Sequence, residues 1–122
     1  MDYVRKVDFD TIRDTAERFT QPLIDHTSGA TTCSVNCIKT PPDGGSPAGL
    51  HTHEVDQLFY ILSGTMHVEI DGEEHAAGPG SLVVFPAGVP HRNWNGGTEP
   101  TVHLAIQTPL PDPEAPFARP VS

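Results

Sequence analysis

Apolar and polar residues alternate with a period of two over much of this chain, and this pattern predicts short β-strands. From Leu50 onward, turn residues interrupt the alternation at Ser63-Gly64, Asp71-Gly72 and Gly78-Pro79-Gly80. The strands expected between such breaks span residues 31–39, 57–62, 65–70, 73–77, 81–85, 91–95 and 102–108. Many short strands separated by turns, without a long helical segment, indicate an all-β domain.

Two of the expected strands, 57–62 and 65–70, flank Ser63-Gly64, which we interpret as a two-residue hairpin loop. In that register Gln57 lies opposite Ile70. One face of the hairpin is then largely apolar and carries Gln57, Phe59, Ile61, Met66, Val68 and Ile70. The other face also carries large apolar side chains, so we expect both faces to be covered. The N-terminal arm or a second subunit can supply that cover, and we therefore expect a homodimer.

The two ends of the chain differ from the strand-rich middle. Residues 1–29 are expected to form an arm, with a short helix or a strand that packs on the main domain, and Asp10 or Thr11 is a candidate helix cap. Residues 30–110 form the β domain. Residues 111–122 are a proline-rich tail that cannot enter a central strand and is either loose or docked in an extended conformation.

The charge balance restricts the partners of the protein. Seven Lys+Arg against sixteen Asp+Glu give a net charge of −9. This charge repels phosphate backbones and anionic lipids, so we expect no nucleic-acid or membrane partner. The sequence shows no signal peptide and no apolar run of membrane-spanning length. We therefore expect a cytoplasmic protein.

Cys33 and Cys37 are the only cysteines in the chain. On one strand, four residues separate them by about 13 Å. A disulfide requires Cα atoms within about 7 Å, so the two thiols are not expected to bridge each other or to share a metal ion. We interpret them as free thiols in the core, which fits a cytoplasmic protein.

Histidines dominate the candidate chemistry of the chain. His51 and His53 are two residues apart, so on a strand both imidazoles project from one face, as two ligands of one ion must. Gly45 precedes the pair, and Gln57 and Gly64 follow it, in the pattern G-x5-H-x-H-x3-Q-x6-G. A single H-x-H pair is weak evidence for a metal, because histidines on strands more often pack as ordinary polar residues.

A second pattern follows after fifteen residues and contains His91. It runs from Gly80 to Asn95 as G-x5-P-x-G-x2-H-x3-N. The two patterns resemble the paired signature motifs of the cupin superfamily, in that order and at that spacing. The second motif is matched at every fixed position. The first is matched everywhere except at its acidic position, where this chain has Gln57.

The resemblance implies a fold and a ligand set. It implies an all-β double-stranded β-helix, or jelly roll, with one divalent ion inside its open end. It assigns the ligands of that ion to His51, His53 and His91, with Gln57 in the place of the usual glutamate. Iron, zinc, manganese and nickel are the metals that such sites hold. A neutral amide cancels none of the metal charge, so it would bind the ion less tightly than a carboxylate; alternatively, Gln57 binds substrate instead.

Further residues are candidates for roles beside the metal. His103 lies in the alternating strand 102–108 and is a candidate for proton transfer; Glu54 and Asp56 are candidate general bases. The remaining histidines are interpreted as solvated residues. The expected substrate pocket is walled by Phe59, Ile61, Met66, Val68, Phe85 and Trp94.

The preferred functional interpretation is a metal-dependent enzyme that acts on a small, oxygen-bearing organic molecule. Cupins of this kind include dioxygenases, isomerases and polyketide cyclases, and the sequence leaves the choice among them open. The alternative is a non-catalytic module or sensor that binds a metal or a small molecule. No helix-turn-helix pattern precedes the motifs, which argues against a complete transcription factor.

Overall fold

The computed structural model describes residues 3–29, 32–45, 49–109, 114 and 118–121. Nearly all of its regular structure is β, and the elements are α1 (Phe9–Asp14), β1 (Phe19–Ile24), β2 (Ser34–Thr40), β3 (His51–Thr52), β4 (Asp56–Ser63), β5 (Met66–Ile70), β6 (Glu73–Ala77), β7 (Leu82–Phe85), β8 (His91–Trp94), β9 (Thr101–Thr108) and β10 (Arg119–Pro120). In the described part of the chain, no helix is long and apolar enough to cross a bilayer.

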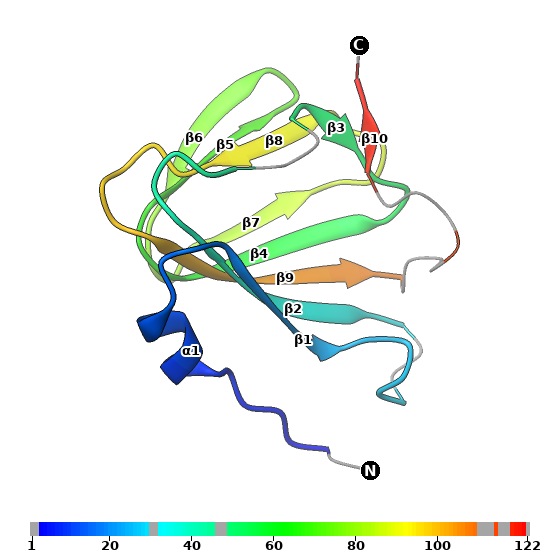
Figure 1. Cartoon of the computed structure of the whole chain (residues 1–122). Coiled ribbons are helices and arrows are strands. Elements are labelled where there is room, and N and C mark those ends of the chain that lie inside the picture. Colours follow the sequence, from blue (N-terminus) through cyan, green and yellow to red (C-terminus); the bar gives the residue numbers. More distant parts are fainter. Residues whose placement is uncertain (1–2, 30–31, 46–48, 110–113, 115–117, 122) are drawn as a thin grey trace.

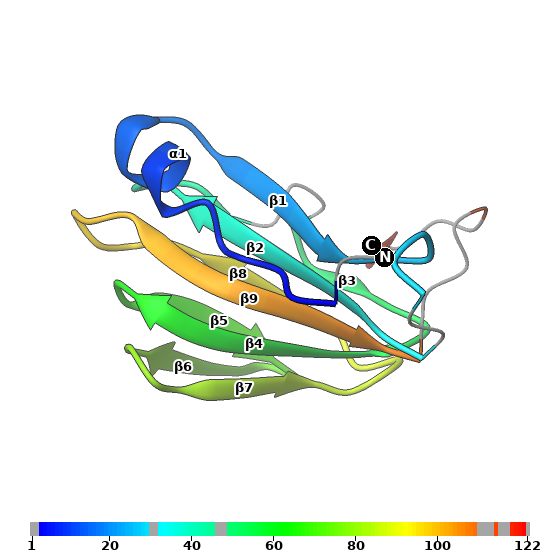
Figure 2. The same ribbon diagram turned by 90° about the horizontal axis from the view of Figure 1, so that it is seen from below.

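The strands form two five-stranded antiparallel sheets that face each other (Figure 1). Sheet A has the order β1-β2-β9-β4-β7, and sheet B has the order β10-β3-β8-β5-β6. Seen from below, sheet A lies in front of β5, β6 and β8 as a separate layer (Figure 2). Because successive strands alternate between the two sheets at several points, the architecture is the expected double-stranded β-helix.

The expected hairpin between 57–62 and 65–70 is wrong. β4 pairs with β7 and β9 in sheet A, whereas β5 pairs with β6 and β8 in sheet B. Gln57 therefore lies opposite Phe85 and Gln107, not opposite Ile70. The Ser63-Gly64 segment is a corner at which the chain crosses from one sheet to the other.

Gly64 is required at this corner. Its φ is 76°, in the left-handed region that favours glycine. A Cβ atom here would lie 2.4 Å from the carbonyl oxygen of Pro100, closer than any real contact. By contrast, Asp71-Gly72 is a true two-residue hairpin loop, because Ile70 pairs directly with Glu73 and both loop residues have positive φ.

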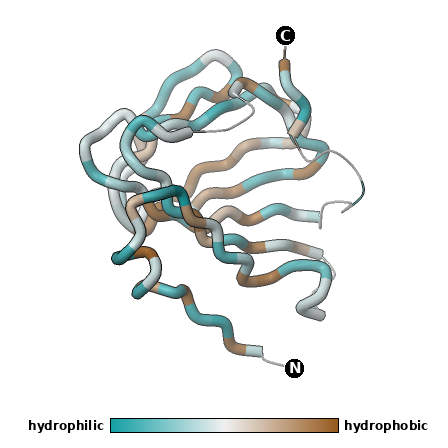
Figure 3. Tube along the Cα trace, in the orientation of Figure 1, coloured by the Kyte–Doolittle hydropathy of each residue, from teal (hydrophilic) through white to brown (hydrophobic). Residues whose placement is uncertain are grey.

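The apolar face assigned from the sequence does line the inside of the molecule. The larger core cluster lies between the sheets and contains Phe59, Ile61, Met66, Val68, Ala77, Phe85 and Ala105. Hydrophobic and hydrophilic positions alternate along several of the strands that enclose it (Figure 3). The inward alternation was thus correctly predicted, although the pairing partner of β4 was not.

The N-terminal arm contains both a helix and a strand. The cap of α1 is Asp8, not Asp10 or Thr11: its carboxylate accepts the backbone N–H of Thr11 at 3.0 Å and the Thr11 hydroxyl at 2.7 Å. These bonds hold the pKa of Asp8 below its usual value. β1 then pairs with β2 at the edge of sheet A.

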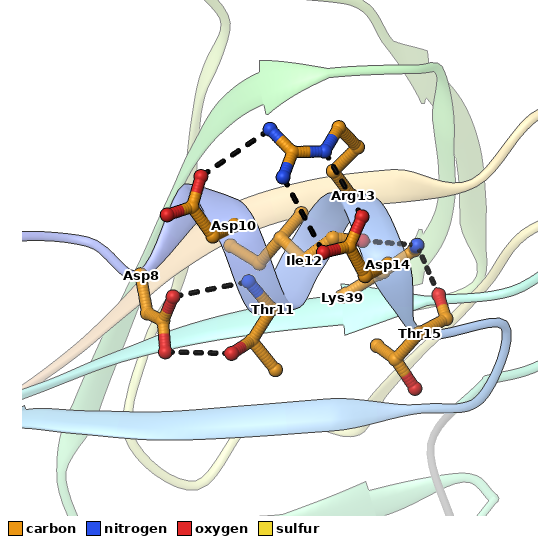
Figure 4. Close-up of polar contacts among 8 residues, drawn as sticks. All are labelled: Asp8, Asp10, Thr11, Ile12, Arg13, Asp14, Thr15 and Lys39. Atoms are coloured by element: carbon orange, nitrogen blue, oxygen red, sulfur yellow. Dashed lines mark hydrogen bonds and ion pairs between the residues drawn. The ribbon is translucent and has the colours of Figure 1, made fainter.

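Lys39 attaches α1 to the outer side of sheet A (Figure 4). Its side chain is buried, and its Nζ donates to the carbonyl oxygens of Ile12 and Thr15, the latter at 2.6 Å. Beside it, Ile12 packs with Cys37 and Val102 in a second core cluster. Both cysteines are free, as predicted; Cys37 is fully buried, which raises its pKa, and Cys33 is half-buried.

The described end of the tail is docked. β10 pairs with β3, with Arg119 opposite Thr52 and Pro120 opposite His51. β10 therefore occupies the edge of sheet B beside the strand that carries His51.

The outer face of sheet A is covered only in part. Leu62 and Leu104 pack against the cluster under α1. Farther along the sheet, Tyr60, Leu82 and Val84 are 40%, 65% and 53% exposed. The expectation of cover on both faces thus holds for the part under α1, and an apolar patch remains on β4 and β7.

Candidate metal centre

Two strands of sheet B bring three histidines together. His51 begins β3 and pairs with His91, the first residue of β8. His53 follows β3 at the i+2 position, so its ring projects to the same side as that of His51. The backbone N–H of Gly88, in the second motif, donates to the carbonyl oxygen of His53 at 2.9 Å. Both sequence motifs therefore meet at one place.

The three imidazoles form a compact, buried group. One ring nitrogen from each of His51, His53 and His91 lies within 4.8 Å of the others, and each side chain is at most 6% exposed. The Nε2 atoms of His51 and His53 are 3.2 Å apart. Two nitrogens at this separation, each about 2.1 Å from one ion, subtend about 100° at it, which lies within the range of metal coordination.

Backbone carbonyls set the tautomers of two of these rings. Nδ1 of His51 donates to the carbonyl oxygen of Gly49 at 2.6 Å, and Nδ1 of His91 donates to that of Val89 at 3.1 Å. In both rings Nε2 then carries the lone pair, as metal ligands require. The Nε2 atom of His91 is buried and has no hydrogen-bond partner within residues 3–29, 32–45, 49–109, 114 and 118–121. The residues therefore fit a metal ion that accepts these lone pairs.

His91 stays neutral near pH 7. Burial lowers its pKa to about 4; the bond to Val89 opposes this shift, and the neighbouring His51 and His53 add to it. A neutral imidazole is the form that binds a metal, so no proton has to be released from this ring at neutral pH.

Gln57 lies on the inner face of β4, in the same region. Its side chain is 6% exposed, and it pairs in register with Phe85. The ring of Phe85 contacts the ring of His91 at a centroid distance of 4.5 Å. Within the described residues the Gln57 amide makes no hydrogen bond, so it is available to a ligand.

The residues expected to transfer protons are not gathered at this cluster. His103 is 1% exposed on the inner face of β9, and its ring contacts Phe59 at 4.2 Å. Glu54 is exposed and forms an ion pair with Arg119 of β10. Asp56 is also exposed, and its carboxylate accepts the backbone N–H of Ala87 at 2.8 Å.

The chain of ring contacts from His91 to His103 runs through Phe85 and Phe59. Neither nitrogen of His103 has a hydrogen-bond partner among the described residues. Burial lowers the pKa of His103 to about 3, with a smaller contribution from Arg18.

Five of the six expected pocket residues lie between the sheets, and Trp94 does not. Phe59, Ile61, Met66, Val68 and Phe85 belong to the inner core cluster. Trp94 lies on the outer face of sheet B, where its ring stacks on His67 at 5.8 Å and the Arg92 guanidinium lies 4.9 Å from its centre. His91 and Trp94 are three positions apart on one strand, so their side chains point to opposite faces.

Sequence reasoning missed a buried polar pair on the same inner face. The hydroxyl of Ser34 on β2 donates to Oε1 of Gln107 on β9 at 2.6 Å, and both residues are buried. Gln107 was placed in the alternating strand 102–108, on the same face as His103. The two-residue period therefore indicated that Gln107 faces inward, but it did not reveal the bond to Ser34.

Comparison with known proteins identifies the family of the chain. The family model of the cupin domain matches residues 38–107, which is more than half of the chain. This chain is a cupin. No curated protein matches its sequence closely enough to count as a relative.

Solved structures resemble this cupin over most of its length. The polyketide cyclase RemF from Streptomyces resistomycificus is 28% identical, with a TM-score of 0.72 over 87% of this chain and 72% of that one. A proposed sugar phosphate isomerase from Acidithiobacillus ferrooxidans is 27% identical, with a TM-score of 0.65 over 78% and 61%. An RmlC-like cupin from Methanocaldococcus jannaschii, 19% identical with a TM-score of 0.72 over 89% and 92%, shares the double-stranded β-helix fold.

Proposed function

We propose that this cupin binds one divalent metal ion through His51, His53 and His91 and acts as a metal-dependent enzyme on a small, oxygen-bearing organic molecule. The observation that carries the proposal is the group of three buried imidazoles whose ring nitrogens lie within 4.8 Å of one another. Gln57 completes the ligand set or binds the substrate. Iron, zinc, manganese and nickel all accept imidazole ligands.

The ion would supply Lewis-acid chemistry by polarising an oxygen atom of the substrate or, if it is redox-active, would allow reaction with dioxygen. The protein contributes the fixed tautomers of His51 and His91 and a wall of apolar side chains between the sheets. Because the ligand set is neutral, the full charge of the ion remains available for the substrate. Lewis-acid chemistry of the cyclase or isomerase type is therefore favoured over dioxygenase chemistry, and the similarity to RemF supports the cyclase type.

A second candidate function is a non-catalytic binding module or sensor. The observation that favours it is the placement of Glu54 in an exposed ion pair with Arg119, away from the role of a general base. The two functions can be separated by comparing wild-type protein with His91→Ala after iron, zinc or manganese is added back. An enzyme loses turnover of dioxygen or of a diketone in the variant, whereas a binding module shows no turnover in either protein and differs only in ligand affinity.

We also propose that the protein is a homodimer and that it is cytoplasmic. The patch of Tyr60, Leu82 and Val84 supports the dimer, because it lies at the edge of sheet A and bears no charge on a protein with a net charge of −9. A second copy of this uncharged face can meet it without like-charge repulsion. The free thiols of Cys33 and Cys37 fit a reducing compartment.

A further inference from the structure

A row of residues crosses the inner face of sheet A at the level of Gln57. Ser34 on β2 pairs in register with Gln107 on β9, Gln107 pairs with Gln57 on β4, and Gln57 pairs with Phe85 on β7. Residues directly opposite each other on neighbouring strands have Cβ atoms about 4.5–5.5 Å apart. The row ends at the metal centre, because the Phe85 ring contacts that of His91 at 4.5 Å.

The hydroxyl of Ser34 orients the Gln107 amide. It donates to Oε1 of Gln107 at 2.6 Å, and both side chains are buried. With Oε1 engaged, the amide presents its Nε2 donors to the rest of the row. A buried amide held by one fixed bond loses little conformational freedom when a ligand accepts its free N–H groups.

The free ends of both amides are not fully enclosed by the protein. Within the described part of the chain, Nε2 of Gln107 and both amide atoms of Gln57 make no hydrogen bond. The polar atoms that are both fully enclosed and without a partner belong to Thr40, His91, Thr101 and His103. The amide atoms of Gln57 and Gln107 are not in this group. The amide atoms are therefore accessible, although the two residues are only 3% and 6% exposed.

No buried lysine or arginine lies in this row, as far as the structure describes the chain. Among the described residues, the only buried cationic side chain is Lys39, which donates to α1 and its C-cap on the outer side of sheet A. Arg119 is exposed and pairs with Glu54. Arg18 donates to the carbonyl oxygen of Gly45 and lies near enough to His103 to lower its pKa, but it is not paired in register with any residue of this row. A phosphate group would therefore find neither an arginine fork nor a lysine beside Gln107.

We propose that Gln107 binds the substrate and that Ser34 positions it. This inference rests on the proposed function and narrows its substrate class to unphosphorylated compounds with at least two oxygen atoms, one of which can accept a hydrogen bond from an amide. One oxygen would face the metal centre, and a second would accept a hydrogen bond from Nε2 of Gln107. The apolar body would lie against Phe85 and the core residues beside it.

The test uses the zinc-loaded full-length protein and a neutral 1,3-diketone, benzoylacetone, with binding measured by titration calorimetry. Gln107→Leu should weaken diketone binding about tenfold, because it removes the hydrogen bond from the amide to the ligand. Ser34→Ala should weaken binding about threefold, because it removes the bond that orients this amide. Ser34→Thr keeps the hydroxyl and should restore wild-type affinity. Thr40→Val is the matched control: it removes a buried hydroxyl from the inner face of the same strand, and the affinity should not change.

Zinc content is measured for every variant, so that failure of the metal site is distinguished from failure of this inference. Absence of zinc from the wild-type protein contradicts the proposed function. If zinc is bound but benzoylacetone does not bind, or binds Gln107→Leu as tightly as wild type, the inference is wrong and the metal site stands. It is also wrong if fructose 6-phosphate binds more tightly than the diketone. Should Gln107→Leu fail to fold, loss of affinity in Ser34→Ala and its recovery in Ser34→Thr decide the question.

Discussion

His103 provides a quantitative prediction about acid sensitivity. The residue is 1% exposed, and neither ring nitrogen has a hydrogen-bond partner in the part of the chain that the structure describes. Burial lowers its pKa in the folded protein from 6.5 to about 3. Below pH 6.5 the unfolded chain therefore binds a proton that the folded protein does not, and stability falls as the pH falls from 6.5 towards 3.

The size of this effect follows from the two pKa values. Between pH 7.5 and pH 5.0, His103 should remove about 2 kcal/mol from the free energy of unfolding, because each unit of pKa difference corresponds to about 1.4 kcal/mol. In His103→Leu this loss disappears, while the contribution of His91 remains in both proteins. At pH 7.5 the variant should be at least as stable as wild type, because it removes two buried polar atoms that lack partners.

The assay is urea denaturation of metal-free protein at pH 7.5 and pH 5.0, followed by circular dichroism. The drop in unfolding free energy should be smaller in His103→Leu than in wild type by about 2 kcal/mol. His75→Leu, which removes an exposed histidine, is the control and should behave as wild type. An equal drop in wild type and His103→Leu would refute the reasoning, because His103 would then have similar proton affinity in both states.

Three further predictions concern other parts of the molecule. Gln57→Glu should raise metal affinity about tenfold, since a carboxylate cancels one charge of the ion; unchanged affinity in competition with a chromogenic chelator would show that Gln57 is not a ligand. Lys39→Met should lower the free energy of unfolding by about 2 kcal/mol, because it removes the bonds from Nζ to two carbonyl oxygens of the α1 region; a urea midpoint equal to that of wild type would contradict this role. Combined Leu82→Lys and Val84→Lys should convert a dimer to a monomer in sedimentation analysis, and a dimer that persists would place the interface elsewhere.

The grouping of the three histidines could be predicted from the sequence because the spacing within each motif is local. His51 and His53 share a face at i and i+2, and the second motif places His91 after a proline and glycine bend. The pairing of β4 could not be predicted in this way. A glycine corner between two sheets and a two-residue hairpin leave the same alternation on both sides. Only the strand pairing of the folded molecule, in which β4 joins sheet A and β5 joins sheet B, distinguishes them.

One error about Trp94 and one contact of Glu54 that no prediction addressed have different physical origins. Trp94 was assigned to the pocket although its odd separation from His91 places it on the opposite face, so the two-residue period already contained the correct answer. The partner of Glu54 depends on the docking of β10, which brings Arg119 from the far end of the chain. A contact across such a long sequence separation leaves no mark in local periodicity.

The metal content of the protein tests the central claim most directly. Protein prepared without a polyhistidine tag should contain about one iron, manganese, nickel or zinc ion per chain by elemental analysis. His51→Ala should lose that ion, whereas His75→Leu should retain it. A wild-type protein that contains no metal and takes none up from solution would contradict the account, and the three imidazoles would then have to serve some other ligand.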